Sequence, residues 1–227
     1  MTITEERNRL VPNPGGDMKI DGETRSARVE REILRAATAA FVGKGYDGTS
    51  MEEIATRAGV SKQTIYKHFT DKENLFGEVV KSTAVYANDI VESVTTLLSE
   101  AEFIKGGLRQ LSRLLMKMFM DEELLRLRRL IISNADRMPQ LGRSWYRNGF
   151  ERMLVSMATC FQELTSRGLM KTPDPQIAAS HFFGMLLWIP MNEAMFTGGI
   201  RRSEAELVQH ADASLEAFLA IYGVHRK

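Results

Sequence analysis

The chain has 227 residues, of which 44% are hydrophobic and 26% charged, a composition typical of a globular protein with a real core. Its net charge of +1 excludes a polycation, so binding to nucleic acid would require a local basic patch. The single cysteine, Cys160, excludes an internal disulfide and a cysteine-built zinc site, and the lack of an apolar run near the roughly 18 residues of a membrane span predicts a cytoplasmic protein without membrane contact.

Residues 1–25 are rich in proline, glycine and mixed charges and have no apolar period, so we expect this segment to be disordered. From Ser26 onward, apolar residues recur at spacings of three and four, which predicts a helix that ends at Gly43. After a glycine-rich loop, Thr49 and Ser50 can both cap the next helix, with an acidic residue three positions later.

The stretch from Met51 to Phe69 has the pattern of two short helices joined by a tight turn. Ala55 leaves room for close helix contact, Gly59 suits a turn with positive φ, and Ser61 is a good N-cap for the second helix. The exposed face of that second helix would be polar and basic. This is the pattern of a helix-turn-helix that reads the major groove of double-stranded DNA, and we assign residues 26–72 to such a domain.

Helical patterns continue to the end of the chain, and no run alternates convincingly with period two. A capping box at Thr70-Asp71-Lys72-Glu73 would start a long helix to about Leu98, and a kink is expected near Pro190. We therefore predict an all-α fold of about nine helices, with a three-helix DNA-binding domain followed by a helical domain over residues 73–227. The remaining helices are expected at 103–119, 122–137, 139–168, 173–196 and 203–222.

FVGKGYDGTSMEEIATRAGVSKQTIYKHFTDKENLF resembles the N-terminal domain of the TetR family of transcriptional regulators, with a match over about residues 28–80. The later stretch RLRRLIISNADRMPQLGRSWY is similar to the AefR-like branch of that family. The resemblance implies a homodimeric repressor whose C-terminal helical domain holds both the dimer interface and a ligand pocket. It also implies that Thr49 and Lys72 contact phosphates and that Tyr66 meets the DNA backbone.

Side-chain chemistry supports DNA contact independently of the resemblance. Lysine can donate to guanine or phosphate, glutamine can pair with adenine, and a helix N-terminus favours an anion. The alternative for Lys62 and Lys67 is a solvated helix face, and His68 could equally face a phosphate or pack against its neighbours. The predicted DNA-binding residues are Thr49, Ser61, Lys62, Gln63, Thr64, Tyr66, Lys67, His68 and Lys72.

Signals for other functions are weak. Residues 43–48 fit the pattern GxGxxG, but a helix precedes them and no βαβ unit is predicted, so we interpret these glycines as a turn. The four histidines are scattered, and HExxH and GxSxG are absent. We therefore expect no enzyme activity, no cofactor and no metal site.

The C-terminal region is rich in methionine and aromatic residues, which suits an adaptable pocket for an apolar or aromatic small-molecule effector. The alternative for each of these residues is ordinary core packing. The predicted ligand-binding residues are Met116, Phe119, Trp145, Phe150, Met153, Met157 and Phe183. Apolar stripes on the last two helices predict a homodimer interface made by Phe182, Leu186, Leu207, Ala211, Leu215 and Phe218.

Together these patterns predict a ligand-responsive transcriptional repressor that binds a near-palindromic operator as a dimer. The alternative is a small-molecule-binding helical protein whose DNA binding is lost or secondary. The operator, the effector and the regulated genes do not follow from the sequence.

Overall fold

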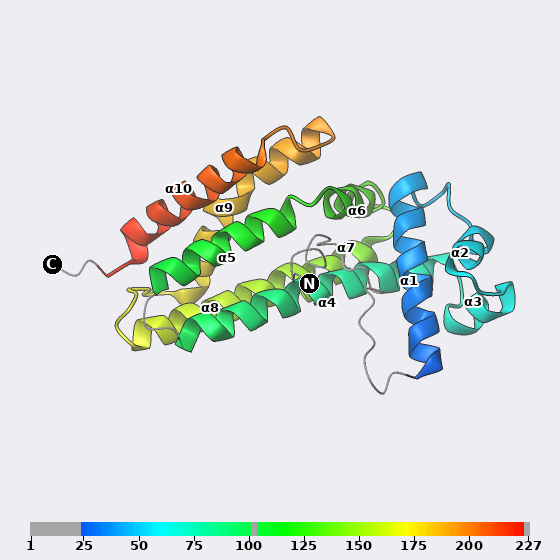
Figure 1. Cartoon of the computed structure of the whole chain (residues 1–227), viewed down its shortest axis with the longest axis horizontal. Coiled ribbons are helices and arrows are strands. Elements are labelled where there is room, and N and C mark those ends of the chain that lie inside the picture. The colour runs from blue at the N-terminus through cyan, green and yellow to red at the C-terminus, as the bar shows by residue number, and fades with distance from the viewer. Residues whose placement is uncertain (1–23, 101–103, 225–227) are drawn as a thin grey trace, which may run out of the picture. The chain divides into compact units, whose positions relative to one another are not determined.

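The computed structural model describes residues 24–100 and 104–224, and every regular element in this part of the chain is a helix (Figure 1). The all-α prediction is confirmed. The α7, η1 and α8 elements run without interruption, so the described residues form nine continuous helical segments. The elements are α1 (Arg25–Lys44), α2 (Met51–Ala58), α3 (Lys62–His68), α4 (Lys72–Glu100), α5 (Ile104–Phe119), α6 (Glu122–Ser133), α7 (Pro139–Trp145), the π-helix η1 (Tyr146–Glu151), α8 (Arg152–Ser166), α9 (Pro175–Thr197) and α10 (Glu204–Tyr222).

Most helices begin where the sequence places a capping side chain. Ser50 accepts a hydrogen bond from the backbone N–H of Glu53, and Ser203 forms a full capping box with Glu206. At α4 the predicted capping box at Thr70 is wrong, because the Asp71 carboxylate accepts the bond from the N–H of Asn74. One expected bound also differs, since α6 ends at Ser133. The segment expected to be interrupted near Pro190 is one helix, α9, with Pro190 inside it, and a kink there stays a prediction.

The chain divides into two compact units whose limits differ from the predicted domains 26–72 and 73–227. The first unit contains residues 24–86 and 126–146, and the second contains residues 87–125 and 147–224. The long helix α4 therefore contributes to both units, and the segment around α7 joins the first. The predicted disorder of residues 1–23 falls outside the described residues, whereas Thr24 caps α1 and Arg25 is its first helical residue.

The first unit has a core formed by α1, α2, α3, the start of α4 and the segment from α6 to α7. Ile33, Ile54 and Ile65 are completely buried in it. The ring centroid of Phe41 lies 4.9 Å from that of Phe76. Burial of these large side chains fixes the short helices α2 and α3, which have too few residues to be stable alone.

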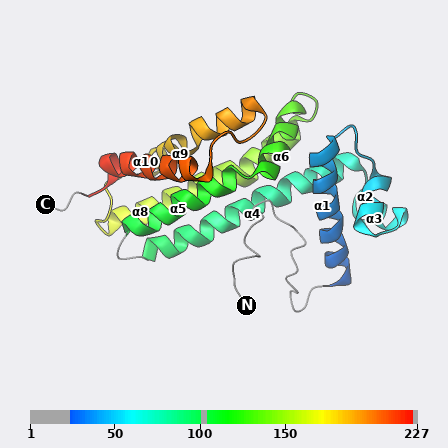
Figure 2. The same ribbon diagram turned by 45° about the horizontal axis from the view of Figure 1, so that its top comes forward.

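The second unit packs α5, α8, α9 and α10 against one another (Figure 2). Its core contains a cluster of phenylalanines from α8, α9 and α10. The ring centroids of Phe161 and Phe182 lie 5.2 Å from that of Phe218, in stacked and edge-on arrangements respectively. Cys160 is buried on α8, and burial raises the pKa of its thiol to about 12. Among the helices that the structure describes, none combines the length and apolarity needed to cross a membrane.

Candidate nucleic-acid interface

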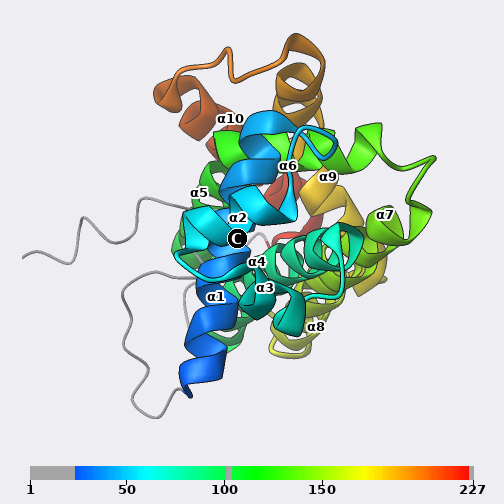
Figure 3. The same cartoon turned by 90° about the vertical axis from the view of Figure 1, so that its right-hand side faces the viewer.

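The turn between α2 and α3 has the geometry that the sequence predicts (Figure 3). Gly59 adopts φ 68° and ends α2, and the backbone N–H of Val60 donates to the carbonyl of Ala55 at 3.0 Å. Ala55 is buried against the core, and Ser61 caps α3 by accepting from the N–H of Thr64. The two helices therefore form a rigid pair whose orientation is set by the turn at Gly59 and by the small buried side chain of Ala55.

Side chains on the outer face of α3 remain available to a ligand. Gln63 and Lys67 are exposed, Tyr66 is partly exposed, and Thr64 is half-buried. The side chain of Lys62 is 66% exposed, but its ammonium lies 2.5 Å from a carboxylate oxygen of Glu52. The hydrogen bond with Glu52 raises the pKa of Lys62 and lowers the pKa of Glu52. Lys62 would have to exchange this partner for a phosphate or base to contact DNA.

Thr49 is not placed to bind a phosphate, contrary to the prediction. It is 2% exposed, and its hydroxyl lies 2.8 Å from the carbonyl oxygen of Gly45 and 3.2 Å from that of Ala40. The N-cap of α2 is the exposed Ser50. The Ser50–Glu53 spacing in the sequence indicates that Ser50 can cap α2. The predicted DNA contacts include Thr49 at this position of the chain but not Ser50.

Lys72 also points into the protein rather than toward an external anion. Its ammonium donates to the carbonyls of Tyr46 and Thr49, each at 3.0 Å, and lies 4.4 Å from the centroid of the Tyr46 ring. The predicted phosphate contact of Lys72 is therefore not supported by its geometry. The glycine-rich loop that it holds connects two helices, and Gly45 at φ 76° provides the turn, as we expected for the GxGxxG pattern.

His68 was predicted either to face a phosphate or to pack, and its geometry agrees with packing. Its side chain is 13% exposed, and its Nδ1 lies 3.9 Å from a carboxylate oxygen of Glu30. Its ring centroid is 6.2 Å from that of Phe69, a buried residue of the core. A backbone phosphate would have to displace Glu30 to reach this imidazole.

The predicted effector residues do not form one pocket. Trp145 packs against the core of the first unit, whereas the other six belong to the second unit. There, the Phe150 ring centroid lies 5.7 Å from that of Phe119 and 6.3 Å from that of Phe183. The methionines Met116, Met153 and Met157 are buried. Five of these six side chains are therefore buried core in this structure, which was the alternative that the sequence left open, and Phe150 is partly buried beside them.

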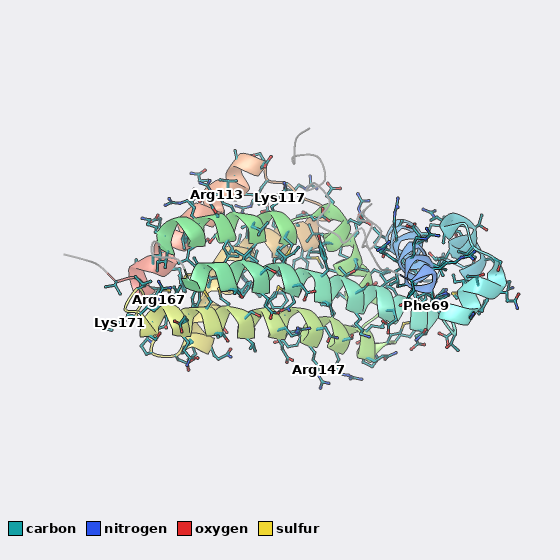
Figure 4. All side chains as sticks on the ribbon, turned by 60° about the horizontal axis from the view of Figure 1, so that its bottom comes forward. Phe69, Arg113, Lys117, Arg147, Arg167 and Lys171 are labelled. Carbon is teal, nitrogen blue, oxygen red and sulfur yellow. The ribbon has the colours of Figure 1, made fainter. Side chains whose placement is uncertain are left out.

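A groove of about 950 Å³ lies elsewhere in the second unit, between the C-terminal half of α4 and α8. Its lining is rich in hydroxyl and charged groups, including Glu92, Thr95 and Arg167, and Arg167 lies near the end of α8 in Figure 4. Sequence reasoning missed this groove, because α4 and α8 are far apart in the chain and their facing polar residues carry no motif.

The predicted dimer residues are also buried within the single chain. Phe182 and Leu186 of α9, and Leu207, Ala211, Leu215 and Phe218 of α10, are core residues of the second unit, so the single chain does not expose them to a second copy and their place in an interface stays a prediction. The exposed apolar side chains of these helices are different ones. Trp188 is 65% exposed and Phe196 is 87% exposed on α9, and Ile177 and Ile189 of α9 and Ile221 of α10 are also more than half exposed.

Within residues 24–100 and 104–224, no group of three His, Cys, Asp or Glu side chains could hold a metal ion. The features that the structure does bring together are a helix-turn-helix with a polar outer face and a separate helical unit. They define the class of helix-turn-helix regulators with an additional helical domain.

Family models identify the family to which the chain belongs within this class. Residues 33–79 match the model of bacterial regulatory proteins of the tetR family, and residues 106–224 match the C-terminal domain of AefR-like transcriptional repressors. The chain belongs to the TetR family of transcriptional regulators.

Solved structures agree with this assignment. A TetR-family structure from Mesorhizobium loti is 76% identical with a TM-score of 0.86, and the match covers 89% of this chain and all of that one. The flavonoid-responsive regulator FrrA is 26% identical with a TM-score of 0.66, over 88% of this chain and 99% of FrrA.

Curated relatives match over a shorter region. The transcriptional activator FasR of Mycolicibacterium smegmatis is 42% identical over 34% of this chain and 35% of its own length. The negative regulator IcaR of Staphylococcus aureus is 35% identical over 26% of this chain and 32% of its own length. The chain thus spans about a third of the length of these two relatives.

Proposed function

We propose that this protein represses transcription by binding a near-palindromic operator as a homodimer, with α3 in the major groove. The observation that carries the proposal is the rigid α2–α3 pair with the exposed polar face of α3, on a chain of the TetR family. The match to the C-terminal domain of AefR-like repressors supports repression rather than activation.

The exposure of each side chain supports the following set of proposed DNA contacts. Base contacts are assigned to Gln63 and Lys62, with Thr64 beside them, because these side chains lie on the outer face of α3. Phosphate contacts are assigned to Lys67, Tyr66 and Ser61, and to the N-terminus of α2 with its cap Ser50, where backbone N–H groups favour an anion. Thr49, His68 and Lys72 are assigned supporting roles.

We assign the dimer contact to the exposed apolar side of α9, centred on Trp188 and Phe196. Exposed aromatic and aliphatic residues gathered on one side of a helix are typical of an interface. A two-fold dimer would place two α3 helices in successive major grooves, about 34–36 Å apart, which requires a near-palindromic site.

For the effector we propose an apolar or aromatic molecule that binds in the second unit beside Phe119, Phe150 and Phe183. The structural relative FrrA is a flavonoid-responsive regulator, and flavonoids are aromatic, which supports an aromatic ligand. Entry would require these packed rings to move, which aromatic and methionine side chains tolerate well. The effector would release DNA only if it binds more tightly to the conformation in which the reading helices are misplaced.

The test begins with selection of binding sites from random DNA, followed by affinity measurements on the selected sequence. Lys67→Ala should weaken binding to all sequences and lower the salt slope by about one, because one phosphate contact is lost. Gln63→Ala should instead relax preference at one base position, by about 1–3 kcal/mol of discrimination. An unchanged salt slope would remove Lys67 from the phosphate contacts, and an unchanged consensus would remove Gln63 from base recognition.

The alternative, a small-molecule-binding protein with lost or secondary DNA binding, predicts a different outcome. In that case neither selected DNA nor the gene's own upstream region would give a specific mobility shift at moderate salt.

A further inference from the structure

Tyr46 is the centre of a cluster that links the glycine-rich loop to two distant parts of the first unit. Its ring lies 4.4 Å from the ammonium of Lys72 on α4 and 5.3 Å from the guanidinium carbon of Arg137. The same ring packs against Phe41 and Phe76, at centroid distances of 5.9 Å and 5.3 Å. The loop is therefore held by two cation–π contacts as well as by core packing.

Arg137 comes from the connection between α6 and α7, which is remote in sequence from the loop. Its guanidinium donates to both carboxylate oxygens of Asp47, at 3.0 Å and 3.4 Å, and to the side-chain oxygen of Asn134 at 3.0 Å. A few residues later, Gln140 donates to the carboxylate of Glu73 at the start of α4. The connection is thus attached to the loop through Arg137, and the start of α7 is attached to α4 through Gln140.

The loop held in this way leads directly into the DNA-reading helices. Lys72 binds the carbonyls of Tyr46 and Thr49, and Ser50, the next residue, caps α2. Because Gly59 forms the tight turn that joins α2 to α3, and Ala55 and Ile65 of the two helices are buried in the same core, a displacement of the loop would move both helices. Changes of about 1 Å at such a site are enough to lose a large part of the binding energy, since hydrogen bonds to DNA weaken steeply with distance.

We propose that Lys72 and Arg137 are positioning residues for DNA binding, and that Arg137 makes the position of the loop depend on the α6–α7 connection. This inference rests on the proposed DNA-binding function. It assigns Lys72 a different role from a phosphate contact, because two of its three N–H donors already bind loop carbonyls. It also supplies a route by which the second unit would affect DNA binding. The chain passes from one unit to the other within α6, at residues 125–126, and directly after α7, at residues 146–147.

The salt dependence of DNA affinity separates positioning from phosphate contact at Lys72. Lys72→Met should weaken binding to the selected operator about tenfold while leaving the salt slope unchanged, since no counterion-releasing contact is removed. Lys67→Ala serves as the control that lowers the slope. A slope lowered by about one in Lys72→Met, or an unchanged affinity, would overturn the assignment of Lys72.

A double-mutant cycle with Asp47 tests the role of Arg137. Because both side chains are exposed, we expect the variants to fold. Arg137→Ala should weaken operator binding about three- to tenfold. In the Asp47→Ala background, the same substitution should change the logarithm of the operator Kd by at most half as much. Tyr46→Phe keeps the ring and the loop carbonyl and should bind normally, whereas Tyr46→Leu should weaken binding. A melting temperature and tryptophan fluorescence equal to wild type would show that the fold is intact.

Additive effects of Arg137→Ala and Asp47→Ala, or normal binding by Arg137→Ala, would overturn the role of Arg137. Wild-type protein that binds its selected operator, with variants that bind equally well, would defeat this inference and leave the proposed function standing. Wild-type protein that binds no specific DNA would defeat both.

Discussion

Thr49 and Lys72 act on backbone carbonyls of the loop between α1 and α2. The Thr49 hydroxyl lies within hydrogen-bonding distance of the carbonyls of Ala40 and Gly45, and the Lys72 ammonium binds those of Tyr46 and Thr49. Buried carbonyls need such donors, because an unsatisfied polar group in the interior is costly. The two side chains therefore stabilise the loop that precedes the reading helices.

Replacing Thr49 with valine tests whether its hydroxyl stabilises the loop between α1 and α2. Thr49→Val should lower the free energy of unfolding by about 1–3 kcal/mol, because it leaves the loop carbonyls without their donor in a buried site. Urea denaturation would measure the change. Thr56→Val is the matched control, since the Thr56 hydroxyl makes a similar bond to Glu52 on the exposed side of α2 and should cost at most about 0.5 kcal/mol. Equal losses for the two variants would contradict the role of Thr49.

At the scale of elements, α9 has two faces with different roles. One face carries Phe182 and Leu186 into the core of the second unit, and the other exposes Trp188 and Phe196. A helix that is apolar on both sides is expected where it packs against two partners. On its inner side α9 packs against α8 and α10. We propose that its outer side packs against a second copy of the chain.

Trp188→Glu should shift the protein from dimer to monomer, because it places a charge in the apolar centre of the proposed interface. The dimer dissociation constant should rise at least tenfold in analytical ultracentrifugation. Val155→Glu is the control, as Val155 is an exposed apolar residue on α8 of the same unit. A dimer that survives Trp188→Glu unchanged would place the interface on another surface.

Ion pairs connect α5 to α10 along the surface of the second unit. Arg113 binds Asp212 through two hydrogen bonds, and Glu216 accepts hydrogen bonds from Lys105 and Arg109. Arg113 and Lys117 lie along one side of α5 in Figure 4. The bond from Arg113 lowers the pKa of Asp212 below its ordinary value of 3.8, and the bond from Lys105 lowers the pKa of Glu216 below 4.5.

Because these carboxylates have lower pKa values when folded, their stabilisation is present above the unfolded values and is lost as the pH falls through the folded ones. Arg113→Gln should therefore lower the melting temperature slightly at pH 7, and the difference from wild type should shrink below about pH 4. It should also shrink in high salt, since the pair is exposed. A difference that is independent of both pH and salt would contradict an ionic origin.

At the scale of the whole molecule, each unit has its own core. The core of the second unit depends on Phe218, whose ring contacts Phe161, Phe182 and Tyr222. The first unit depends on Phe41 and Phe76. Damage to one core should therefore be seen first in the unit that contains it.

Phe218→Ala should destabilise the second unit by about 3–5 kcal/mol, since it leaves a large cavity among packed rings. Hydrogen exchange measured by mass spectrometry should show faster exchange in α5, α8, α9 and α10, with α1 to α3 protected as in wild type. Val155→Ala, at an exposed site, is the control and should change little. Equal loss of protection in both units would show that they unfold together.

The sequence alone was sufficient to predict the all-α class and the local geometry of the helix-turn-helix. Ala55, Gly59 and Ser61 act through steric fit, backbone conformation and capping, which depend on neighbours close in the chain. The membership of the TetR family could be predicted for the same reason, since its motif is local.

Tertiary structure decided where the remaining side chains point. Thr49 and Lys72 have the position in sequence of phosphate ligands, but burial and nearby carbonyls turn them inward. Phe182 and Phe218 lie on apolar stripes, and periodicity cannot tell an intrachain core from a dimer interface, because both bury apolar area equally well. Local chemistry thus determined the reading motif, whereas long-range packing decided which residues support it and which remain free to contact a partner.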